Sequence, residues 1–562
     1  MSKSIRLILL VSLSFYSCLL MHSRAESAET SGQPELEALG ARYGGVYRRE
    51  LGSDPSTLDP AYLTETFGRA VASQIFDGLV QFDAHLQPIP AIAELWEASR
   101  DGRIWTFFLR RGVKFHHGRE VTAHDFVYSF TRLLQLGSPG PVTNFFARIQ
   151  GVKDFMQGKA LSVEGLKAVD QYTLQIALEE PYMSSLAVLG LTNAAVVPQE
   201  EVDRLGDNFG RFPVGAGPFK FSRWKPNQEI ILEANEDYYE GRPFLSAILF
   251  KIVLGARLEE RFTEFLQGNL EETIIPSGKT DEVRLNPIYQ KYQHIRKPTL
   301  SFLYISFNTR FKPFDDLRVR QAFSYAIDVE EIVKKITKMG SIPAIGPLPP
   351  GMPGYDPTLQ GYSYNLAEAK RLLSEAGYPN GIGFPIVQLW SAHQAESTKA
   401  ELASYQRYLA DLGVKVEIHY APDWPTYKAM LEQGKLPMFR LIWMADIPDP
   451  DNTLYALLQS TSPNNYRFYH NPRLDQLLEA ARREVDDIQR VALYREVERI
   501  AIADAPWIPQ HHSVLDYLFQ PYVQGVEVSL LGRRSMPLKK VWFKKELRVS
   551  SAGAAIDVES SR

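Results

Sequence analysis

Residues 105–125 read WTFFLRRGVKFHHGREVTAHD, and this stretch decides the expected fold. The aromatic run at 105–109 predicts a strand that ends at the Arg-Arg-Gly of positions 110–112. Residues 122–125 then read Thr-Ala-His-Asp, the kind of sequence that caps a helix. The helix after them has one apolar face, made by Phe126, Phe130, Leu133 and Leu134.

Outward from this stretch, short apolar runs that predict strands alternate with helical patterns. A chain of 562 residues suggests two or three packed units. Mixed strand and helix order predicts an α/β protein whose sheets are covered by helices. The expected strands are 230–234, 248–252, 303–307, 414–418 and 439–443, and the expected helices are 257–266, 317–327, 366–375, 396–412 and 474–504, the last as two helices.

The amino terminus has the pattern of a secretory signal peptide. Lys3 and Arg6 precede an apolar run, and Ser23-Arg24-Ala25 supplies small residues at the cleavage site. We therefore expect residues 1–25 to be removed, residues 26–43 to be a linker and residues 546–562 to be a flexible tail. The alternatives are a membrane anchor and lipidation at Cys18, the only cysteine.

The overall composition argues against several classes of function. The formal charge is −4 and the sequence has no basic arm, so the electrostatic footprint of a nucleic-acid binder is missing. Nucleophile-elbow, Walker and His-Glu-x-x-His motifs are also absent from the sequence. Adjacent histidines such as His116 and His117 face opposite sides of a strand, so they do not suggest a metal site. We expect a protein that is not an enzyme and that has no cofactor.

Five sequence blocks, in order along the chain, resemble the extracellular solute-binding proteins of family 5, which bind dipeptides and oligopeptides. One departure is His117, where the family usually has aspartate. The blocks are 56–60 with 75–79, 93–125, 213–219 with 235–239, 307–309 with 318–322, and 443–452.

The resemblance implies a type II periplasmic-binding-protein-like fold, in which two lobes joined by a hinge close over a ligand. It also implies an additional domain on the first lobe. Carried onto this chain, the first lobe takes residues 44–78, 197–297 and 508–545, the additional domain takes 79–196, and the second lobe takes 298–507.

In peptide binders of this family, the aspartate of the Trp-x-x-Asp block holds the ligand's amino terminus, and here it is Asp446. A buried ammonium needs such a carboxylate. If 439–446 stays extended, Arg440 and Asp446 point the same way, about 20 Å apart at ~3.3 Å per residue. That separation suits the two termini of an extended peptide. Some oligopeptide binders of the family carry an arginine at the position that matches Arg440, so the resemblance makes Arg440 the candidate partner of the ligand's carboxylate, with a surface or interdomain salt bridge as the alternative.

The middle of a peptide would pair with an exposed strand edge.

Around Leu431 and around His393 the chain lacks basic residues that some peptide binders carry, which leaves the ligand's length open. The remaining ligand-binding candidates are Trp443, Met444, Trp424, Trp390, Asp54 and Ser56.

Together these inferences predict a monomeric periplasmic protein that binds short peptides and delivers them to the permease subunits of an ABC transporter. Two alternatives stay open. The same fold could bind an oligosaccharide, opine, haem or metal chelate, or the chain could be a cell-wall peptide hydrolase.

Overall fold

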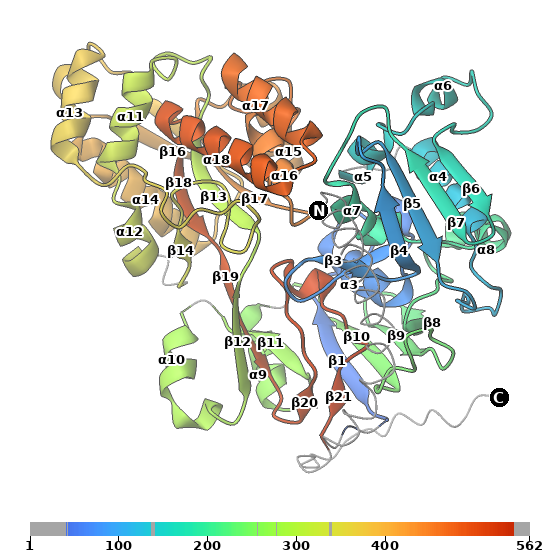
Figure 1. The fold of residues 1–562 in the computed structure, drawn as a ribbon. Helices are drawn as coiled ribbons and strands as arrows, with labels where there is room; N and C mark the ends of the chain where they lie inside the picture. Colours follow the sequence, from blue (N-terminus) through green and yellow to red (C-terminus); the bar gives the residue numbers. More distant parts are fainter. Residues whose placement is uncertain are drawn as a thin grey trace, which may run out of the picture.

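The computed structural model describes residues 41, 43–136, 141–255, 257–276, 278–336 and 340–544. These residues form two lobes connected by a pair of long strands (Figure 1). The expected signal peptide with Cys18, nearly all of the linker and the expected tail lie outside the described residues. Among the residues described, no helix is both long and apolar enough to cross a membrane.

The first lobe is built on a four-stranded sheet in the order β1-β10-β9-β8. Strand β1 (Val46–Leu51) pairs in parallel with β10 (Ala247–Ile252), and β9 (Glu229–Ala234) and β8 (Phe219–Lys225) continue the sheet antiparallel. Helix α3 (Thr66–Ile75) contributes Val71 and Ile75 to the same core, which also holds Ile230 and Ile248.

An additional domain is inserted between α3 and β8. Its sheet has the order β4-β5-β7-β6, with strands Ala93–Ala98, Ile104–Leu109, Thr173–Ala177 and Leu166–Asp170. Helix α4 (Ala123–Leu136) packs Phe126 and Phe130 into its core. The helix starts where expected, because Asp125 accepts hydrogen bonds from the amide and hydroxyl of Thr122. The smaller helices are α5 (Pro141–Phe146), α6 (Val152–Met156), α7 (Ser185–Leu189) and α8 (Gln199–Leu205).

The second lobe has a six-stranded sheet with the order β14-β18-β13-β17-β15-β16. All seven residues of β13 are buried, so this sheet is covered on both faces. Its strands are β13 (Ser301–Phe307), β14 (Ile342–Pro343), β15 (Val387–Ser391), β16 (Val416–Tyr420), β17 (Met438–Met444) and β18 (Trp507–His512).

Alternate residues of β13 enter two different cores. Phe302 and Tyr304 pack with one set of helices, whereas Ile305 and Phe307 pack with the other. The first set is α15 (Trp424–Glu432), α16 (Pro450–Leu458), α17 (Pro472–Arg483) and α18 (Asp487–Asp504), and the second is α11 (Leu317–Ala326), α13 (Leu366–Glu375) and α14 (Glu396–Asp411).

Two neighbouring crossings of the chain connect the lobes. Strands β12 (Gln293–Pro298) and β19 (Val514–Phe519) form a three-stranded sheet of the first lobe with β11 (Glu272–Ile274). Strand β12 continues directly into β13 of the second lobe, and β18 of the second lobe continues directly into β19. At the crossing, the Thr299 amide donates to the Ser513 carbonyl at 2.8 Å and the Ser513 amide donates to the Ser301 hydroxyl at 3.0 Å. A short two-stranded connection of this kind suits a hinge.

Helix α18 carries a buried carboxyl group that makes the stability of this lobe depend on pH. Burial raises the pKa of Glu498 to about 7, although the Leu348 amide, which donates to it at 3.1 Å, opposes that shift. The folded state therefore binds this proton more tightly than the unfolded state. Stability should fall as pH rises from the unfolded pKa of 4.5 to about 7.

We expect Glu498→Gln to remove this loss, which amounts to about 3 kcal/mol above pH 7. Urea unfolding of both proteins at pH 4.5 and pH 8 measures it. The matched control is Glu496→Gln, a residue of the same helix whose side chain is 42% exposed. If Glu498→Gln and the wild type lose stability in parallel between these pH values, the prediction is wrong.

Candidate functional site

Arg69 of the first lobe faces the second lobe from helix α3. The helix begins at Thr66 and is capped by Glu65, whose carboxylate accepts hydrogen bonds from the amides of Phe67 and Gly68. This cap fixes the first turn, from which Arg69 extends. The Arg69 side chain is 19% exposed, so its guanidinium lies in a partly desolvated position.

Asp446 lies opposite Arg69, just after the end of strand β17. The strand ends at Met444, the Ala445 amide donates to the Leu300 carbonyl, and the Asp446 amide donates to the Asn452 side chain at 2.9 Å. The carboxylate oxygen Oδ1 of Asp446 is 2.8 Å from Nη1 of Arg69. This ion pair joins the two lobes.

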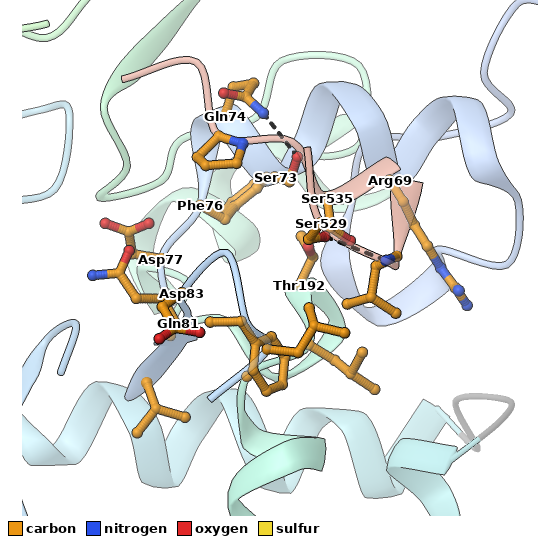
Figure 2. A pocket seen from close by; sticks show the side chains of 18 of the residues that line it. Arg69, Ser73, Gln74, Phe76, Asp77, Gln81, Asp83, Thr192, Ser529 and Ser535 are labelled. Atoms are coloured by element: carbon orange, nitrogen blue, oxygen red, sulfur yellow. Dashed lines mark hydrogen bonds between the residues drawn. The ribbon is translucent and has the colours of Figure 1, made fainter. Parts of the chain in front are cut away.

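Arg69 and Asp446 both line a cavity, and Figure 2 shows most of the side chains around it. Segments of the first lobe and its additional domain supply the lining, and among the described residues that line it Asp446 is the only one from the second lobe. Its volume of about 130 Å³ is below the ~300 Å³ at which ligand pockets begin. The cavity as it stands is therefore too small to enclose a short peptide. The polar lining includes Ser73, Gln74, Gln81, Thr192, Ser529 and Ser535.

A buried acid and a lysine lie at one side of this cavity. Asp77 accepts hydrogen bonds from the hydroxyls of Tyr238 and Tyr239 at 2.8 and 3.0 Å. Burial raises the pKa of Asp77, and Lys539 partly opposes that shift. Lys539 pairs in turn with Glu240 at 2.6 Å. Both charges are thus already balanced within the protein.

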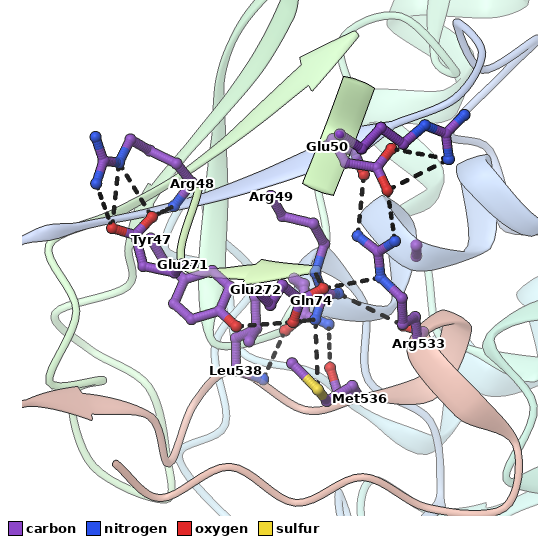
Figure 3. Close-up of polar contacts among 12 residues, drawn as sticks. Tyr47, Arg48, Arg49, Glu50, Gln74, Glu271, Glu272, Arg533, Met536 and Leu538 are labelled. Carbon is purple, nitrogen blue, oxygen red and sulfur yellow. Dashed lines mark hydrogen bonds and ion pairs between the residues drawn. The ribbon is translucent and has the colours of Figure 1, made fainter. Parts of the chain in front are cut away.

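A buried ion network fixes the carboxy-terminal segment that lines the cavity (Figure 3). Arg533 contacts Glu50 at 2.6 Å and Glu272 at 2.8 Å, and Arg49 contacts Glu272 at 2.9 Å. The Glu272 side chain is fully buried. Although burial raises the pKa of Glu272, the positive charges of Arg49 and Arg533 outweigh it and lower that pKa.

The additional domain also contacts the second lobe. The Tyr182 hydroxyl donates to Asp451 at 3.1 Å, and Arg490 donates to the Ser184 hydroxyl at 3.1 Å. Asp451 is held on its own lobe by Arg482 at 2.6 Å. Because these groups are nearly completely buried, separating the lobes here would expose them to water.

Several of the expected site residues gather at one edge of the second lobe's sheet. Strands β15, β16 and β17 are parallel neighbours, so their carboxyl ends meet at one edge. Open α/β sheets bind ligands outside such an edge. Trp390 stacks on His419 with ring centroids 4.8 Å apart, while Trp424 and Met444 are 49% and 50% exposed. Trp443 is partly buried, and its indole nitrogen has no partner among the described residues.

Of the expected site residues, only Asp446 lines the cavity. The four at the sheet edge lie outside its lining, and so do Arg440, Asp54 and Ser56. Arg440 makes a two-point ion pair with Glu401 of α14, at 2.7 and 3.0 Å. Asp54 accepts hydrogen bonds from the Trp224 indole and the Asn227 amide, and Ser56 is exposed. The condition behind the expected spacing of Arg440 and Asp446, that 439–446 stays extended, is not met, because β17 ends at Met444.

The sequence did not indicate Arg69 or the cavity lining. Arg69 belongs to an ordinary amphipathic helix, and nothing in the local sequence distinguishes it from a solvated arginine. The lining combines segments near residues 70, 190 and 530 that only the fold brings together. Among the residues that line the cavity, only Asp446 stands in a sequence block that indicated a ligand site.

Comparison with known sequences gives matches over most of the chain. The profile of bacterial extracellular solute-binding proteins, family 5 Middle, matches residues 87–465. Heme-binding protein A of Haemophilus influenzae is 32% identical over 500 residues, which cover 85% of this chain and 89% of that protein. The periplasmic oligopeptide-binding protein OppA of Salmonella typhimurium is 30% identical, with the same shares covered.

Solved structures match equally broadly. The periplasmic binding protein DppA from Helicobacter pylori, in complex with peptide STSA, has a TM-score of 0.71 and 29% identity, covering 91% of this chain and 100% of that one. The unliganded open form of the periplasmic murein tripeptide binding protein MppA has a TM-score of 0.75 and 26% identity, covering 89% and 97%.

Proposed function

The chain belongs to the bacterial extracellular solute-binding proteins of family 5, and from this premise we propose that it captures short peptides between its lobes for an ABC importer. The observation that carries the proposal is the position of Asp446. Its carboxylate lies at the contact between the lobes, paired with a cation from the opposite lobe. A peptide's ammonium is a cation that could take the place of Arg69 there.

The carboxyl edge of the second lobe supports the rest of the proposed site. Trp390, Trp443 and Met444 lie at the carboxyl ends of their strands and Trp424 begins the helix that follows β16, and these side chains would receive apolar side chains of the peptide. The backbone of the peptide would pair with a strand edge. Arg440 as partner of the ligand's carboxylate stays a prediction, since that role requires it to leave Glu401.

Closure of the lobes would couple binding to delivery. Contacts of the peptide with both lobes favour the closed arrangement over an open one. The two-stranded connection at Thr299 and Ser513 would serve as the hinge for this motion, and the Tyr182–Asp451 contact would form as the lobes meet. The proposal places the protein in the periplasm as a monomer that hands its ligand to the permease subunits, with no catalytic step.

Thermal unfolding with added tripeptide tests this function. At a concentration one hundred times its Kd, a ligand that binds only the folded state adds about 2.7 kcal/mol of stability. We expect trialanine to raise the melting temperature and N-acetyl-trialanine, which has no ammonium, to raise it much less. Equal shifts with both peptides would contradict the Asp446 assignment, and no shift with any free peptide would contradict peptide capture.

A second ligand class has support from the relatives. One relative is named a heme-binding protein, and a structure of the binding protein AgaA, 26% identical, contains agropinic acid. Native mass spectrometry of freshly purified protein separates the two candidates, since a co-purified peptide and a co-purified haem or opine differ in mass.

A further inference from the structure

The ion pair between Arg69 and Asp446 has a consequence for the kind of peptide that the site prefers, provided that the proposed function holds. If a ligand ammonium replaces Arg69 on Asp446, the Arg69 guanidinium loses the one carboxylate that it contacts at 2.8 Å. Its Nε atom is already buried and has no partner among the described residues. A cation left unpaired in a partly buried position is unfavourable.

The other carboxylates that line the cavity are already occupied. Asp77 is held by two tyrosine hydroxyls, and Asp83 accepts from the amides of His85 and Gln87 in its own turn. Glu527 pairs with Lys540 at 3.2 Å. Each of the other carboxylates in the described lining thus already has partners within the protein. The best source of a new carboxylate for the displaced guanidinium is therefore the ligand itself.

We propose that Arg69 is a specificity-determining residue, and that with Asp446 it selects peptides whose first residue is acidic. The ammonium of that residue would bind Asp446, and its side-chain carboxylate would bind the released Arg69. Both ligand charges belong to one residue, which suits two protein charges whose contacting atoms are 2.8 Å apart. The planar guanidinium can hold a carboxylate through two parallel hydrogen bonds.

Titration calorimetry with the peptide amides Glu-Ala-Ala-NH₂ and Gln-Ala-Ala-NH₂ tests this proposal. Amidation leaves the first side chain as the only carboxylate, so a terminal carboxylate cannot imitate the effect. We expect the wild type to bind the Glu peptide about tenfold more tightly than the Gln peptide. Arg69→Met, which keeps the apolar part of the side chain, should bind the Glu and Gln peptides with equal affinity. It should still bind the Gln peptide measurably.

The matched control is Arg223→Met on strand β8, whose exposed ion pair with Glu229 lies outside the cavity lining. It should keep the tenfold preference. Two results overturn the proposal while leaving peptide capture intact, namely equal binding of both peptides by the wild type or an unchanged preference in Arg69→Met. If the wild type binds neither these peptides nor trialanine, peptide capture itself fails and this inference fails with it.

Discussion

Replacing Glu272 with alanine is expected to destabilise the protein by about 3–5 kcal/mol, the usual effect of removing one partner from a buried ion network. The substitution leaves Arg49 without its carboxylate and leaves Arg533 with Glu50 only. The side chains of Arg49 and Arg533 are only 1% and 16% exposed, so water compensates poorly for the lost carboxylate. Urea unfolding at pH 7 measures the loss, because the lowered pKa keeps Glu272 charged there and its contribution disappears only as pH falls through that pKa.

Glu330→Ala provides the control for this effect. Glu330 pairs with Lys334, but the two side chains are 70% and 66% exposed. Its removal should change stability by less than about 0.5 kcal/mol. A Glu272→Ala protein as stable as Glu330→Ala would show that the network does not hold the carboxy-terminal segment against the first lobe.

Asp446→Asn is expected to weaken the binding of peptides with a free amino terminus by about a hundredfold. Asparagine keeps the shape of the side chain but removes the charge that the ammonium pairs with, and such losses amount to about 2–5 kcal/mol at desolvated charge pairs. Since the Asp446 side chain is 25% exposed, the lower part of that range applies. Titration calorimetry with trialanine measures the change.

A comparison with N-acetyl-trialanine isolates the charge interaction. The acetylated peptide should bind the wild type and Asp446→Asn with equal, weak affinity, because the contact is already missing. Asp83→Asn alters another acidic residue that lines the same cavity and should change the affinity for trialanine by no more than about twofold. A full hundredfold loss in Asp83→Asn as well would mean that general charge, not the anchor, controls binding.

The sequence predicts the elements well where local pattern determines them. Residues 105–109 and 230–234 lie in strands, as their short aromatic and apolar runs predict. The two helices expected in 474–504 are α17 and α18, separated at Glu484 to Asp486. The family resemblance and the two-lobed α/β fold are confirmed.

The site is only partly readable from the sequence. Asp446 stands in a recognisable block, whereas Arg69, Tyr182 and Arg533 gain their roles from partners more than two hundred positions away. Arg440 is the opposite case, a residue that the sequence suggested for the site but that the fold pairs within the protein. Its position in β17 suggested a ligand contact, but the partner that the fold supplies is Glu401 on α14. Such pairings depend on how helices and sheets pack, and local sequence does not encode them.

The most direct measurement is a crystal structure of the protein bound to a short peptide with a free amino terminus. We expect both lobes to contact the peptide, with its terminal nitrogen about 2.7–2.9 Å from an Asp446 carboxylate oxygen and Arg69 moved off that carboxylate. A peptide bound elsewhere, with Asp446 facing bulk solvent or still paired with Arg69, would contradict the account.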